Sequence, residues 1–167
     1  MSLYLIRGGI YRNCCFEFYG SHNRIKFGNN CSARNGSFYI EDSNNSIITG
    51  NRTNYAGKIH IACTESQTIL IGDECLFSSE IVIRSGDSHS IINSNGNRIN
   101  YAMNVKIGNH VWVGYRVLIN KGVCIPDNCV IGTGAVLTKP YTERNTVIAG
   151  VPAKVVKREI NWMTKRV

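Results

Sequence analysis

His89 is the residue best suited to chemistry in this chain, in the stretch GDSHS. An imidazole titrates near neutral pH, so a positioned histidine can take a proton from a hydroxyl group as a general base. Asp87 stands two residues earlier and can accept the other ring N–H, or it can point to the opposite side of the loop; Glu80 is a weaker alternative. The same residues are also compatible with an ordinary solvated loop.

Trp112 is the second candidate, in the stretch HVWVG. It stands at a position that the surrounding apolar pattern does not require. An indole there can wall a pocket or donate its N–H to a developing oxyanion. The alternative is packing between subunits, which a large aromatic side chain also does well.

The elements that position these residues follow from a six-residue period. An apolar residue recurs every six positions, and small or β-branched residues stand four places later. Such a period predicts one short strand and one corner per hexad, with three hexads per turn of a triangular coil that buries its apolar corners against neighbouring coils. The first set is Ile107, Val113, Ile119, Ile125, Ile131 and Leu137, and the second is Val111, Val117, Val123, Cys129 and Ala135.

The first half of the chain contains a longer repeat of 22 residues, starting at Ile25, Ile47 and Ile69. Gly28, Gly50 and Gly72 superpose in this alignment, as do Phe27, Thr49 and Ile71, and then Tyr39, Ile61 and Ile83. Three hexads use 18 residues, so we expect four extra residues at one corner, around 42–45, 64–67 and 86–89. The pattern is lost after Ile91 and resumes at Val105, which predicts a loop outside the coil wall over about 87–104.

We expect three segments in a single domain: an irregular N-terminal cap over 1–24, the coils over 25–155, and a short helical tail over 156–167. The net charge of +8 favours an anionic partner. No aromatic RNA-binding signature accompanies it, and no stretch is apolar enough for a membrane span. With no visible signal peptide, the default location is the cytoplasm. Cys31, Cys75 and Cys129 are expected as small core residues.

The strings IGNHVWVGYRVLINKGV, VIGTGAVLTK and AGVPAKVV, with DSH upstream, make the chain resemble the hexapeptide-repeat acyltransferases. The W-V-G and A-G-V-P-A-K segments together are similar to acetyl-CoA-dependent O-acetyltransferases of sugars and surface polysaccharides. This resemblance implies an all-β, left-handed parallel β-helix, a homotrimer with active sites between adjacent subunits, and acetyl-CoA as donor. It also implies a catalytic role for His89 and a part for Trp112 and Asp87 beside it.

The resemblance also places the cofactor along the C-terminal half of the chain. Gly114, Gly132 and Gly134 leave a smooth wall for a pantetheine arm, whose amides can pair with the backbone of Thr133 and Ala135. Val151 and Pro152 can face the adenine. The basic side chains expected to meet the phosphates of CoA are Lys139, Lys154 and Arg158. We expect no metal.

Other interpretations stay open. An N-acetyltransferase of an amino sugar nucleotide is disfavoured because several such enzymes carry an extra N-terminal domain, and serine acetyltransferase because no long helical N-terminal region is present. The four histidines are 38, 29 and 21 residues apart, which does not match the zinc carbonic anhydrases of the same fold. A non-catalytic scaffold or polysaccharide-binding solenoid is the alternative of a different class.

Overall fold

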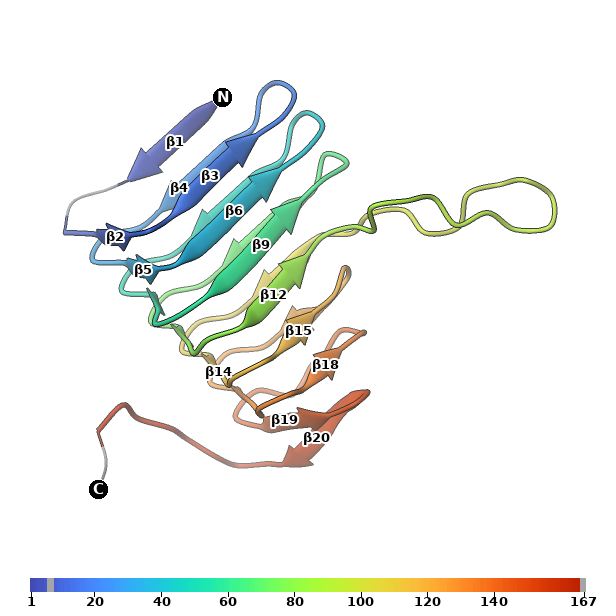
Figure 1. Ribbon diagram of the computed structural model, residues 1–167. Coiled ribbons are helices and arrows are strands. Elements are labelled where there is room, and N and C mark those ends of the chain that lie inside the picture. The colour runs from blue at the N-terminus through green and yellow to red at the C-terminus, as the bar shows by residue number, and fades with distance from the viewer. Residues whose placement is uncertain (6–7, 166–167) are drawn as a thin grey trace.

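The chain winds into a three-sided parallel β-helix, shown as a computed structural model in Figure 1; residues 1–5 and 8–165 are described. Its strands stack into three sheets; each coil from β1 to β18 gives one strand to each sheet, and β19 and β20 extend the second sheet. Sheet A contains β1 (Ser2–Leu5), β4 (Arg24–Phe27), β7 (Ser46–Thr49), β10 (Thr68–Ile71), β13 (Val105–Ile107) and β16 (Cys124–Ile125).

Sheet B contains β2 (Ile10–Arg12), β5 (Ser32–Arg34), β8 (Asn54–Tyr55), β11 (Leu76–Phe77), β14 (Trp112–Val113), β17 (Val130–Ile131), β19 (Val147–Gly150) and β20 (Ala153–Lys157). Sheet C contains β3 (Cys15–Phe18), β6 (Gly36–Ile40), β9 (Ile59–Cys63), β12 (Ile81–Arg84), β15 (Leu118–Ile119) and β18 (Val136–Leu137). The pairing is parallel throughout except between β19 and β20, which run antiparallel.

The core lies inside the triangular tube and is built as the six-residue period predicts. All eleven residues of the two apolar sets from the hexads are buried, with at most 1% of their surface exposed. Cys31, Cys75 and Cys129 are buried among them, which confirms their interpretation as small core residues. Each coil covers the apolar residues of the next, so the core is continuous from end to end.

The 22-residue repeat sets the register of the first coils. Ile47 pairs with both Ile25 and Ile69 in sheet A, as the alignment predicts. In sheet C the prediction is wrong by one residue, because Phe38 rather than Tyr39 pairs with Ile61. The segment from Tyr55 to Ile59 has one residue more than its counterpart from Ala33 to Gly36, and this extra residue shifts the following strand.

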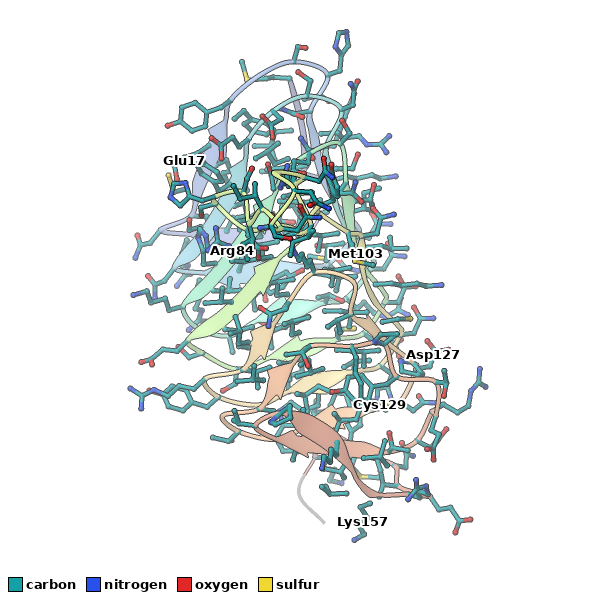
Figure 2. The ribbon with its side chains drawn as sticks, turned by 90° about the vertical axis from the view of Figure 1, so that its right-hand side faces the viewer. Glu17, Arg84, Met103, Asp127, Cys129 and Lys157 are labelled. Atoms are coloured by element: carbon teal, nitrogen blue, oxygen red, sulfur yellow. The ribbon has the colours of Figure 1, made fainter. Side chains whose placement is uncertain are left out.

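Side chains at the corner between sheets A and B tie successive coils together. The N–H of Asn29 donates to Asn51 Oδ1, that of Asn51 to Asp73 Oδ1, that of Asp73 to Asn109 Oδ1 and that of Asn109 to Asp127 Oδ1, at 2.7–2.9 Å. Asp127 marks this corner in Figure 2. These bonds satisfy backbone donors where the strands are interrupted, so the corners stay ordered.

The corner between sheets C and A has its own ladder and carries the expected excursions. Asn45 N donates to Asn23 Oδ1, Gln67 N to Asn45 Oδ1 and Thr68 N to Asn104 Oδ1, at 2.7–2.9 Å. Short loops follow β3, β6 and β9 here, and a much longer one follows β12 (Figure 1). The predicted loop outside the coil wall is therefore confirmed, and we call residues 85–104 the long loop.

The two ends of the chain differ from the sequence expectations. The irregular segment expected at 1–24 is wrong, because β1, β2 and β3 form a regular first coil paired with β4, β5 and β6. This coil has a neighbour on one side only, so many of its residues remain exposed and the apolar period is weak.

The helical tail expected at 156–167 is also wrong within the described residues. Strand β20 runs to Lys157, and no helix follows up to Lys165; residues 166 and 167 lie outside the described part. Instead, Ile160 N donates to Asn145 O and the indole of Trp162 stacks on His110 with ring centroids 4.2 Å apart. These contacts with the coil wall replace the internal hydrogen bonds of a helix. The described residues contain no helix of the length and apolarity needed to cross a membrane.

Candidate active site

The long loop has a fixed base and a small hairpin at its tip. Met103 N donates to Ser85 O at 2.8 Å, which closes the base; Met103 and the neighbouring Arg84 are labelled in Figure 2, where the loop points toward the viewer. Further out, Ile99 N donates to Ile91 O at 2.9 Å and the chain reverses over 93–97. The loop therefore presents its residues from a hydrogen-bonded frame on a rigid scaffold.

His89 lies in the loop segment that leads from β12 into this hairpin, and it is exposed. Its backbone carbonyl accepts a hydrogen bond from Asn100 Nδ2 at 2.8 Å. Its imidazole makes no hydrogen bond to any residue that the structure describes. The backbone of His89 is thus held, while neither ring nitrogen is committed to a hydrogen bond within the described residues.

Asp87 makes no hydrogen bond to the His89 ring and pairs with other residues instead. Its Oδ2 accepts from Lys121 Nζ at 2.5 Å and from Asn100 Nδ2 at 2.8 Å. The hydrogen bond from Lys121 is the main cause that lowers the pKa of this carboxyl group, and that from Asn100 adds to it. Glu80, the weaker alternative, pairs with Arg116 at 2.8 Å.

A second ion pair ties the returning segment of the hairpin to the preceding coil. Arg98 Nη2 donates to Glu65 Oε1 at 2.5 Å, and the N–H of Ala102 donates to Glu65 Oε2 at 3.3 Å. These bonds lower the pKa of Glu65, that from Arg98 most of all. The loop base is therefore held from the coil above through Glu65 and from the coil below through Lys121.

Trp112 lies on a different part of the molecule from His89. It belongs to β14 in sheet B, in a row with Leu76 and Val130, and 41% of its surface is exposed. Its aromatic neighbour is Trp162, with ring centroids 6.0 Å apart. Since the long loop leaves from the corner between sheets C and A, one copy does not bring Trp112 and His89 together.

The three basic side chains expected at the CoA phosphates do come together. Lys139, Lys154 and Arg158 line one hollow of about 340 Å³ at the C-terminal end of the coils. We call this the basic hollow; its other lining residues are Pro140, Tyr141, Thr142, Glu143 and Val155. Glu143 pairs with Arg158 at 2.6 Å, so one of the three cations of the basic hollow is partly neutralised.

The remaining residues expected along the cofactor lie on the same lower coils. The N–H groups of Gly114, Gly132 and Ala135 already donate within the coils, to Ile131 O, Ile148 O and Gly132 O respectively. The backbone N–H and C=O of Thr133 have no hydrogen-bond partner among the described residues. The turn between β19 and β20 carries Val151, 72% exposed, and Pro152.

Three residues of this region were missed by the sequence analysis. Asn100 and Lys121 contact Asp87 from 13 and 34 residues away, and no short motif reports such pairs. The prediction of a helical tail missed the packing of Trp162 on His110; a large aromatic side chain within a charged segment is a signal of such packing. Among the described residues, no group of three or more His, Cys, Asp or Glu side chains could hold a metal ion.

Comparison with known proteins decides the family. The polysialic acid O-acetyltransferase of Neisseria meningitidis is 36% identical over an alignment of 167 positions, which covers 87% of this chain and 78% of that protein. The crystal structure of a polysialic acid O-acetyltransferase superposes with a TM-score of 0.78 and 34% identity, over 99% of this chain and 88% of that one. The chain belongs to the hexapeptide-repeat O-acetyltransferase family. Its fold is thus the left-handed parallel β-helix.

Two further comparisons are with galactoside acetyltransferases, and one of these is a structure that contains coenzyme A. The galactoside O-acetyltransferase of Escherichia coli K12 is 37% identical over 110 residues, 65% of this chain. The chain spans about half (52%) of that relative's length. A galactoside acetyltransferase solved in complex with coenzyme A superposes with a TM-score of 0.54 and 25% identity, over 91% of this chain and 65% of that one. No family model matches the chain.

Proposed function

We propose that this protein transfers acetyl from acetyl-CoA to a hydroxyl group of a sugar or surface polysaccharide. The observation that carries the proposal is the match in sequence and fold to polysialic acid O-acetyltransferases over nearly the whole chain. The coenzyme A complex of a galactoside acetyltransferase supports the donor. The net charge of +8 suits an acidic glycan as well as the phosphates of CoA.

His89 is the general base of the proposed reaction. Its imidazole takes the proton of the acceptor hydroxyl while that oxygen attacks the thioester carbonyl carbon. The tetrahedral intermediate collapses with loss of the C–S bond, and the CoA sulfur leaves with the proton that His89 returns. The acetyl group passes directly to the acceptor, so the reaction needs no cysteine of the chain.

Trp112 and Asp87 take different supporting roles. The indole N–H of Trp112 can donate to the oxyanion, a contribution typically worth about 3 kcal/mol of barrier, or the ring can wall the acceptor pocket. The contacts of Asp87 with Lys121 and Asn100 favour a role in holding the loop base over direct contact with the imidazole. Residues 98–104 of the long loop would border the acceptor.

CoA would bind along the lower coils. Lys139, Lys154 and Arg158 would receive its phosphates in the basic hollow, where three cations close together suit a polyanion. The free backbone groups of Thr133 suit a pantetheine amide better than the N–H of Ala135, which already donates. Gly114 and Gly132 would flank the arm, and Val151 and Pro152 the adenine. We further propose a cytoplasmic homotrimer.

The first prediction replaces the proposed base. His89→Ala should lower kcat by about 10²–10⁴-fold, because the acceptor hydroxyl loses its general base. Acetyl transfer is measured as release of free CoA thiol with a panel of sugars and capsular oligosaccharides. His22→Ala is the matched control and should keep full activity, since His22 is also exposed and its ring hydrogen-bonds to Ser21 alone among the described residues.

Two outcomes would contradict the proposal. Unchanged turnover in His89→Ala, with unchanged circular dichroism, would remove His89 from the mechanism. Titration calorimetry with CoA provides an independent test of the whole assignment, because a non-catalytic scaffold should give no heat. In His89→Ala the heat should persist, since the basic hollow is untouched.

A further inference from the structure

Asn100 lies at the foot of the hairpin and is 7% exposed. Its side-chain amide is fully used: Nδ2 donates to His89 O and to Asp87 Oδ2, both at 2.8 Å, while Oδ1 accepts from Ile91 N at 2.7 Å and from Arg98 Nε at 3.3 Å. An amide has two donors and two acceptor lone pairs, so none is left over. The orientation is dictated by these partners, because a flipped amide would face its oxygen to a carbonyl and a carboxylate.

These four bonds enclose the segment that carries the imidazole. The side-chain amide of Asn100 binds both the carbonyl of His89 and the N–H of Ile91. It thereby continues the hydrogen bonding of the hairpin beyond the backbone bond between Ile99 and Ile91. The backbone on either side of Ser90 is thereby fixed. The amide therefore fixes the backbone that carries the His89 side chain, while it makes no hydrogen bond to the imidazole ring.

The amide is in turn tied to the coil wall. Lys121 Nζ contacts both Asp87 Oδ2 and the backbone carbonyl of Asn100, at 2.5 and 2.9 Å. Lys121 belongs to the coil below the loop, between β15 and β16. A continuous path of hydrogen bonds therefore runs from the rigid solenoid through Lys121 and Asn100 to the backbone of His89.

We propose that Asn100 is the positioning residue of the active site, acting through His89. This inference rests on the proposed function, since it needs His89 to be the base. Three of the four hydrogen bonds of this buried amide go to residues 87–91, the segment that carries His89. The effect of the amide is to hold the imidazole at the place where the acceptor hydroxyl meets the thioester.

The test is Asn100→Asp, which keeps the shape of the side chain and removes both N–H donors. A carboxylate oxygen would then face the carbonyl of His89 and the carboxylate of Asp87, so the segment should shift. We expect kcat to fall on the order of 10²-fold, as for a catalytic group misplaced by about 1 Å, while KM for acetyl-CoA stays unchanged. Hydrogen exchange at the Ile91 amide should become faster in Asn100→Ala, which loses the acceptor.

Matched measurements separate this inference from its alternatives. Asn95→Ala removes another asparagine side chain, from the exposed tip of the same hairpin, and should leave kcat unchanged. A wild-type kcat in Asn100→Asp beside an inactive His89→Ala would overturn the positioning role alone. If KM for acetyl-CoA in Asn100→Asp rises by as large a factor as kcat falls, and the melting temperature also falls, Asn100 has a merely structural role. Full activity in His89→Ala would instead remove the proposed function.

Discussion

At the scale of single residues, two carboxylates from different segments hold the long loop to the solenoid. Asp87 is bonded to Lys121 and Glu65 to Arg98, and these hydrogen bonds lower the pKa of each carboxyl group. The unfolded chain protonates both groups in their ordinary range, near 4, whereas the folded chain protonates them only at lower pH. Their stabilisation is therefore complete above that range and is lost as the pH falls through the lowered folded values.

A pH prediction follows from these two groups. The double variant Asp87→Asn, Glu65→Gln should show a smaller loss of thermal stability than the wild type between about pH 6 and about pH 2. The Asp87 side chain is 44% exposed and screened by solvent, so we expect a difference of only about 2–4 °C in Tm. Calorimetry across the pH range measures it. Glu159→Gln is the control, because Glu159 is exposed and forms no ion pair among the described residues; its loss of Tm with falling pH should match that of the wild type. A double variant that loses as much Tm as the wild type would contradict the linkage.

The sequence located the candidate residues in the fold with uneven success, for a physical reason. The loop position of His89 was predicted correctly because its neighbours break the apolar period, whereas its role as general base stays a prediction. The contacts of Asp87 were not found, because a two-residue spacing suggested His89 as its partner while the fold supplies Lys121. Partners set by stacking of coils lie a whole coil away in sequence, so local spacing does not reveal them.

At the scale of elements, the coils follow from the sequence where both neighbours are present. Hexads from Ile107 to Ile119 have a strand paired on each side, so burial imposes the apolar period on them. The first coil has one neighbour, and its period is too weak to read. The extra residue between Tyr55 and Ile59 is absorbed at a corner and therefore left no signal in the apolar pattern.

The C-terminal arm, residues 158–165, is an element decided by tertiary contacts rather than by local preference. Trp162 stacks on His110 with an interplanar angle of 8°, and its Nε1–H donates to His110 O at 2.9 Å. A stacked pair contributes about 1 kcal/mol beyond area burial and a hydrogen bond about 1 kcal/mol. Together these terms dock an exposed, charged segment that the sequence alone describes equally well as a helix.

Trp162→Ala should therefore release the arm without unfolding the coils. We expect the undocked population to rise about 5–30-fold, the factor that corresponds to one or two kcal/mol. Limited trypsin digestion followed by mass spectrometry measures it as faster cleavage after Arg158. Trp162→Phe keeps a ring over His110 and loses the N–H donor, so its cleavage rate should be intermediate. Equal rates in all three proteins would show that the stack does not hold the arm.

At the scale of the whole molecule, the proposed site is divided among separate faces of the solenoid. His89 extends from the corner between sheets C and A, whereas Trp112 stands on the outer face of sheet B. A rigid three-sided tube cannot fold these faces onto each other. If both residues serve one reaction, the loop of one copy must meet sheet B of another, which a closed ring of identical subunits provides.

The last prediction tests this division directly. Sedimentation of the wild type should give three times the chain mass of 18.6 kDa. His89→Ala and Trp112→Ala should each be inactive or strongly impaired as homotrimers. When the two variants are co-expressed in equal amounts, an intact His89 from one copy meets an intact Trp112 from its neighbour in about a quarter of the sites, so about a quarter of wild-type activity should return. The matched control is each variant co-expressed with itself, which should gain nothing. A site made within one chain predicts no recovery in the mixture, and a monomeric mass would leave the two residues on faces that never meet.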